Sequence, residues 1–219
     1  MARLLFEKTG NAIWISHLDL MRLFQRSFKR AGLPLKHTQG YNPRPSVSIA
    51  LPLSVGVESV CELLDFDLAG CDASDDQIMS QLNMALTEGV RVHKVYSGGR
   101  KLRDLSFLSC SVTLEYDNGV ANNAVQSIDS LFQRQSLPVC KKSKNGLIEQ
   151  DIIPMIKQLS ISQDGANNVV IDAVICCQNP SMNPAQLAQA VAVYLPEIAP
   201  DHSSCRRIEL FDGEMNVFR

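Results

Sequence analysis

Residues 16–58, SHLDLMRLFQRSFKRAGLPLKHTQGYNPRPSVSIALPLSVGVE, contain the features from which the first part of the fold can be predicted. Ser16 is a residue type favoured at helix N-caps, and Asp19 stands at the position where an acidic side chain supports such a cap. Positions with the spacing of one helix face follow, at Leu20, Leu23, Phe24, Ser27, Phe28 and Ala31. Gly32 suits a left-handed helix end, and Pro34 cannot continue a helix. We therefore predict a capped amphipathic helix that ends at Gly32.

The opposite face of this helix is basic. Arg22, Arg26 and Arg30 follow one another at steps of four, which places three guanidinium groups in one row. Such a row suits contacts with phosphates, but it is equally typical of a solvated helix face or of one paired with acidic groups. Asp19 is either part of the cap or a partner of Arg22 or of the neighbouring His17.

The segment 40–45, GYNPRP, is predicted to be a rigid loop, because its two prolines lack N–H donors and Gly40 suits a positive φ. It presents Tyr41, Asn42 and Arg44, and Lys36 precedes it closely. An exposed tyrosine can stack on a base, and the two cations can contact phosphates. A purely structural turn is the alternative interpretation.

The pattern outside this stretch indicates an α+β fold. Strands are predicted at 2–8, 46–51, 61–68 and 90–96, with a second helix at 74–87. This is the βαββαβ order of a ferredoxin-like domain. A similar order follows: strands at 105–116 and 137–142, a hairpin at 159–177, helices at 122–135 and 183–194, and a last strand at 206–211. We predict two ferredoxin-like domains, residues 1–97 and 104–219, with antiparallel sheets and helices on one face.

Composition excludes several classes of protein. The 219 residues are 45% hydrophobic, yet no apolar run is long enough for a transmembrane helix, and residues 1–10 lack the apolar core of a signal peptide. We therefore expect a cytoplasmic protein without a membrane partner. The cysteine count is odd and there is no CxxC pair, so buried reduced thiols are expected, with no metal site and no bound cofactor.

The net charge of −2 hides a strong asymmetry along the chain. Residues 8–50 carry seven lysines and arginines against Asp19 alone, whereas residues 57–88 carry acidic residues and neither lysine nor arginine. Such an asymmetry favours one surface for an anionic partner.

Four motifs resemble a known family: 16–22 SHLDLMR, 30–34 RAGLP, 40–45 GYNPRP, and Pro52-Leu53 followed by 56–59 GVES. This is the family of radical SAM-linked, or radical SAM-associated, proteins, which occur fused to or beside cobalamin-binding radical SAM proteins. The resemblance implies a radical SAM partner and a role in RNA modification, and it assigns no catalytic residue. A downstream motif of that family has Arg before its proline, where this chain has Ile153.

The chain itself has no CxxxCxxC triad, so any radical SAM chemistry belongs to another protein. A second likeness concerns architecture: two ferredoxin-like domains with a histidine near the first helix are similar to CRISPR repeat-processing endoribonucleases and their RAMP relatives. His17 is then the candidate general acid or base, and a histidine hydrogen-bonded at a helix start is the alternative.

Our hypothesis from the sequence is a noncatalytic accessory protein of a radical SAM enzyme, which binds RNA (tRNA or rRNA). The binding residues are His17, Asp19, Arg22, Arg26, Arg30, Lys36, Tyr41, Asn42 and Arg44. The alternatives are a metal-independent endoribonuclease that uses His17, and a protein–protein interaction module.

Overall fold

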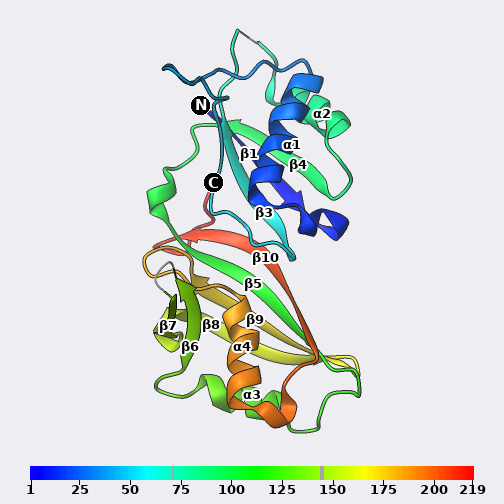
Figure 1. Cartoon of the computed structure of the whole chain (residues 1–219), viewed down its shortest axis with the longest axis vertical. Helices are drawn as coiled ribbons and strands as arrows, with labels where there is room; N and C mark the ends of the chain where they lie inside the picture. The colour runs from blue at the N-terminus through cyan, green and yellow to red at the C-terminus, as the bar shows by residue number, and fades with distance from the viewer. Residues whose placement is uncertain (71, 144–145) are drawn as a thin grey trace. The chain divides into compact units, whose positions relative to one another are not determined.

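The computed structural model describes residues 1–70, 72–143 and 146–219. Its chain forms two compact units (Figure 1). The first unit comprises Met1–Asp104 together with Arg219, and the second comprises Leu105–Phe218.

The first unit is built around a central antiparallel strand pair. Its elements are β1 (Ala2–Lys8), α1 (His17–Arg30), β2 (Val47–Ile49), β3 (Val57–Phe66), α2 (Asp75–Ala85) and β4 (Val90–Ser97). The sheet order is β4-β1-β3, with β2 on the other side of β3, and Leu4 of β1 lies opposite Leu64 of β3. This arrangement is the ferredoxin-like sheet.

Both helices of the first unit cover the same face of its sheet (Figure 1). Alternation along β1 turns Leu4 and Phe6 toward them, and both side chains are fully buried. Phe24 of α1 packs edge-on against Phe6 at a centroid distance of 4.8 Å. Arg3, which precedes Leu4, points to the opposite face of the sheet. It forms a bidentate ion pair with Asp65, with N–O distances of 2.6 and 3.0 Å.

The second unit repeats this topology. Its core elements are β5 (Leu105–Glu115), α3 (Ala124–Phe132), β8 (Ile156–Asp164), β9 (Asn168–Cys176), α4 (Ala185–Tyr194) and β10 (His202–Asp212). The four strands lie in the antiparallel order β10-β5-β9-β8. A two-stranded hairpin, β6 (Pro138–Ser143) and β7 (Gly146–Asp151), is inserted between α3 and β8.

The predicted α+β fold with two ferredoxin-like halves is confirmed, and local details differ. The segment expected as one strand at 137–142 pairs with β7, a strand that sequence analysis did not predict. No helix in the described ranges has the length and apolar character needed to cross a membrane.

The cysteines are divided between core and surface. Cys61, Cys110, Cys177 and Cys205 are buried, as predicted for reduced thiols. The expectation that Cys140 is also buried is wrong: this side chain is exposed on β6 of the β6–β7 hairpin. Cys71 lies outside the described residues.

Burial should make the core thiols unreactive. It raises the pKa of the Cys110 thiol to about 12 and that of the Cys205 thiol to about 11. We expect iodoacetamide at pH 8 to modify Cys140 rapidly in the native protein, and Cys110 and Cys205 only after unfolding, because the thiolate is the reactive form. Peptide mapping by mass spectrometry checks this, and rapid native labelling of Cys110 would contradict it.

The same shifts predict the behaviour of the protein in alkali. The folded-state pKa of Cys110 is raised above the ordinary value of 9.0, so the unfolded chain loses this proton first as the pH rises. The contribution to stability is present below pH 9.0 and disappears as the pH approaches about 12. Denaturant unfolding at pH 8 and at pH 10 should show the decline, and a Cys110→Ala variant should show less of it.

Candidate functional site

The start of α1 is capped as predicted. The hydroxyl oxygen of Ser16 accepts a hydrogen bond from the backbone N–H of Asp19 at 3.3 Å, and it donates to the Asp19 carboxylate at 2.7 Å. The other carboxylate oxygen of Asp19 accepts from Arg22 at 3.0 Å. Two hydrogen bonds lower the pKa of the Asp19 carboxyl group, of which the bond from Ser16 has the larger effect and the bond from Arg22 the smaller. Asp19 therefore belongs both to the cap and to the start of the basic face.

The predicted row of three arginines is divided by the structure. Arg30 donates to the main-chain carbonyl of Ala85 at 2.5 Å and to the Ser27 hydroxyl at 3.2 Å. The fully buried Ser27 hydroxyl donates to the same carbonyl at 3.2 Å. Carbonyls in the last turn of a helix have no partner within that helix and carry partial negative charge. Arg30 thus joins the end of α1 to the end of α2.

A different set of three cations faces solvent. Arg22, Arg26 and Lys29 stand at i, i+4 and i+7 of α1, and all three side chains are exposed. We call these residues the basic stripe. Arg22 forms an ion pair with Asp19, whereas Arg26 and Lys29 form no ion pair with any carboxylate in the part of the chain that the structure describes.

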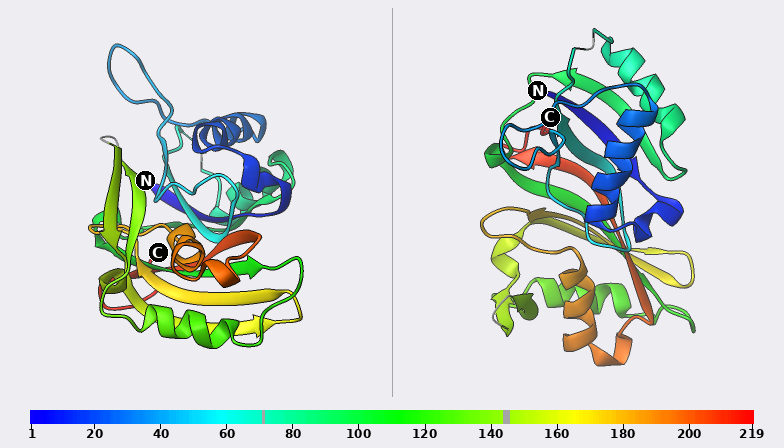
Figure 2. Two further views of the ribbon diagram at one scale, coloured as in Figure 1. Left: turned by 60° about the horizontal axis from the view of Figure 1, so that its bottom comes forward. Right: turned by 45° about the horizontal axis from the view of Figure 1, so that its top comes forward.

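The loop after α1 holds the other predicted binding residues at the surface. Lys36, Tyr41, Asn42 and Arg44 are all exposed. Two hydrogen bonds close the loop, from Thr38 N to the Arg44 carbonyl at 2.8 Å and from Arg44 N to the Thr38 hydroxyl at 3.0 Å. Gly40 has a φ of +140°, as the sequence predicts. The loop stands clear of the helices in the left view of Figure 2.

His17 is the first residue of α1 and is half-buried. Within the described ranges its side chain makes no hydrogen bond, and its role as a general acid or base stays a prediction. His37, the other imidazole of this region, belongs to a bridge with Pro45 at the base of the loop.

An apolar groove lies where α1 ends. It has a volume of about 420 Å³ and lies between residues 32–35 and the bridge formed by His37 and Pro45. Gln25 and Lys29 of α1 contribute its polar lining. Lys29 therefore belongs both to the basic stripe and to this groove.

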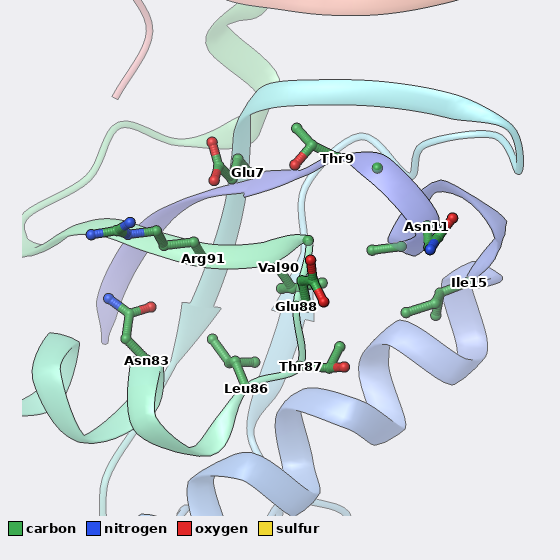
Figure 3. Close-up of a pocket in the computed structure, with 13 residues that line it drawn as sticks. Glu7, Thr9, Asn11, Ile15, Asn83, Leu86, Thr87, Glu88, Val90 and Arg91 are labelled. Atoms are coloured by element: carbon green, nitrogen blue, oxygen red, sulfur yellow. The ribbon is translucent and has the colours of Figure 1, made fainter.

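A larger, polar pocket of about 720 Å³ lies elsewhere in the first unit (Figure 3). It lies among the end of β1, the turn that follows, the end of α2 and the start of β4. Two of its polar groups are already engaged: Glu7 pairs with His93 at 3.1 Å, and the Asn83 amide bonds both main-chain groups of Val92 at 2.8 Å. None of the nine predicted binding residues lines this pocket.

The floor of this pocket depends on one glycine. A Cβ atom on Gly89 would stand 2.3 Å from the Thr9 carbonyl oxygen, and the backbone there has a φ of +79°. Its carbonyl accepts from Thr9 N at 2.8 Å. Among the described side chains no three His, Cys, Asp or Glu residues gather to hold a metal ion, here or elsewhere.

Three exposed apolar side chains around the start of α1 are not among the residues predicted from the sequence. Trp14 is 67% exposed, Leu18 66% and Val55 53%. The indole of Trp14 rests on Gly56, where a Cβ atom would be 3.4 Å from the ring. A tryptophan so close to a helix cap, in a chain with few aromatic residues, was the signal available in the sequence. We call these three residues the apolar cluster.

Comparison with known proteins places the chain in a family. Residues 2–184 match the family of uncharacterised proteins conserved in bacteria (DUF2344). The chain belongs to the DUF2344 family. No curated protein matches this DUF2344 chain.

Solved structures show a similar fold. A chain of the crystal structure of a Cbf5-Nop10-Gar1 complex superposes with a TM-score of 0.54 at 7% sequence identity, over 95% of the DUF2344 chain and 48% of the other. The DUF2344 chain thus spans about half the length of that chain. A second match, to an unknown protein from Galdieria sulphuraria, has 11% identity over 94% of this chain and 96% of the other, with a TM-score of 0.26.

The division of the arginine row predicts two different mutational effects. We expect Arg30→Ala to lower the free energy of unfolding by about 1–2 kcal/mol, because it removes charged hydrogen bonds at the end of α2. Arg26→Ala should change it by less than about 0.5 kcal/mol, since both side chains are exposed but only Arg30 forms hydrogen bonds in the described structure. Urea denaturation of the two variants measures the difference, and equal losses would show that Arg30 does not join the helices.

Proposed function

We propose that this DUF2344 protein is an RNA-binding accessory protein, without a catalytic role of its own, that serves a radical SAM partner. The observation that carries the proposal is the basic stripe, in which Arg22, Arg26 and Lys29 face solvent along one line of α1. Lys36 and Arg44 continue the positive charge beyond the helix, and both are exposed.

The chemistry of these groups supports a phosphate backbone as the ligand. Guanidinium and ammonium groups are the usual contacts of nucleic-acid phosphates, and Arg offers a planar pair of donors to one phosphate. The fully exposed Tyr41 adds an aromatic face in the same loop as Arg44. Single-stranded RNA is bound by this combination of charge and stacking.

Two observations support a protein partner. The 16–22 motif that carries the resemblance to radical SAM-linked proteins forms the first turns of α1, and its Leu18 is part of the apolar cluster. Exposed Trp side chains are frequent anchors of protein interfaces. The similar chain of known structure comes from a Cbf5-Nop10-Gar1 complex, so a protein of this fold occurs in a multiprotein assembly. The identity of the partner proposed for this chain rests on the 16–22 motif alone.

RNA binding has a measurable salt dependence. We expect single-stranded RNA to be retained in filter binding at low salt, with an affinity that falls as salt rises by a slope of about 0.7 per neutralised phosphate. The double variant Arg26→Ala/Lys29→Ala should reduce that slope by about 1.4, because it removes two such contacts.

The matched control is Lys101→Ala, which removes an exposed cation outside the stripe. It should leave the slope close to that of the wild type. An absence of RNA binding at low salt, or an equal loss of slope in the control, would end the RNA proposal.

Partner binding can be followed through Trp14, which is the single tryptophan of the chain. We expect iodide to quench its fluorescence strongly in the isolated protein, because the side chain is 67% exposed. Addition of a radical SAM protein that lacks tryptophan near its interface should protect Trp14 from iodide. A Leu18→Ser variant should bind more weakly, whereas Met84→Ser, at an exposed apolar residue of α2, should not. Unchanged quenching at saturating partner would refute docking on the apolar cluster.

A further inference from the structure

We propose that the apolar groove at the end of α1 binds the base of a nucleotide whose phosphate is held by Lys29. This inference deepens the RNA-binding proposal and rests on it. It assigns a specificity site that includes Gln25, Lys29 and His37, none of which is among the nine predicted binding residues.

The shape of the groove suits a planar ring. Its lining includes Leu33, which is 1% exposed, together with Pro34, Pro45 and His37. The imidazole of His37 supplies a planar ring on which a base can stack, and the apolar side chains supply contact area. The volume of about 420 Å³ falls within the range of small-ligand sites.

The opening of the groove is kept free by the way the helix ends. Gly32 has a φ of +70°, and nothing lies within 4 Å of the position that its Cβ would occupy. The chain then turns away through Pro34, so no further helical turn fills the space. The left-handed helix end, predicted as a stop signal, thus also opens the groove.

The polar groups at the groove match the two ends of a nucleotide. Lys29 supplies a cation, and no carboxylate lines the groove, so an anion is favoured. Gln25 stands one turn earlier on α1 and is half-buried. In the described structure its side-chain amide makes no hydrogen bond, which leaves both a donor and an acceptor for the edge of a base. A ligand with a planar apolar ring, hydrogen-bonding groups on the edge of that ring and an anionic group fits all of these features.

Free nucleotides and RNA share this chemistry, so the experiment separates them. The first measurement is NMR titration of the full chain with AMP, GMP, CMP, UMP and ribose 5-phosphate. We expect the nucleotides to shift the resonances of Leu35 and His37, and ribose 5-phosphate, which has no base, to bind at least about tenfold more weakly, as loss of base stacking predicts. Equal affinities, or shifts only at other residues, would overturn the proposal.

The second measurement compares single-stranded RNA 12-mers with 12-mers of the same length in which the bases are replaced by abasic units. We expect weaker binding of the abasic chain to the wild-type protein. Equal binding of both overturns the groove as a base site while RNA binding stands. Binding of mononucleotides without any binding of either 12-mer supports the groove and overturns the RNA role. An absence of binding in every arm overturns both.

Gln25→Leu tests the role of the amide. It keeps the size of the side chain and removes its donor and acceptor, so we expect the preferred base to lose about tenfold in affinity and the order among the four nucleotides to change. The control Gln126→Leu makes the same substitution at an exposed position of α3 and should leave that order unchanged. Identical base preferences in wild type and Gln25→Leu would overturn the assignment of Gln25.

Discussion

The hydrogen bonds from Arg30 and Ser27 to the Ala85 carbonyl set the orientation of α1. They join the last turn of α1 to the last turn of α2, and Phe24 of α1 packs on Phe6 of the sheet. The basic stripe faces solvent as a consequence. One cation of this helix therefore has a structural role, and that role places the others where a ligand can reach them.

Local features were predictable from the sequence, and features that depend on distant residues were not. The Ser16 cap and the glycine at the helix end involve neighbours within a few positions, so their residue types predict them. The engagement of Arg30 depends on α2, more than fifty residues further along the chain. The groove likewise brings Pro34 and Pro45 into one lining, and the ring of Trp14 packs on the distant Gly56. Local sequence patterns do not predict such contacts, because the residues that form them are far apart in the chain.

The two units share a topology but differ in the chemistry of their helices. The sequence of α1 alternates cations with buried aliphatic and aromatic side chains, whereas α3 and α4 contain neither lysine nor arginine. The sheet order is the same in both units. Because the same order supports both kinds of helix, the ligand chemistry proposed here is a property of the residues added to the first unit and does not follow from its fold.

The close approach of Thr9 to Gly89 has a consequence for the evolution of this chain. With a carbonyl oxygen 2.3 Å from where a methyl carbon would stand, and a left-handed backbone, position 89 accommodates only hydrogen. A substitution there would separate the turn after β1 from the start of β4, and no compensating change of a flexible side chain can relieve a clash with main chain. Selection at this codon should therefore be purifying even in lineages whose ligands have changed, so the glycine reports the backbone contact and is uninformative about specificity.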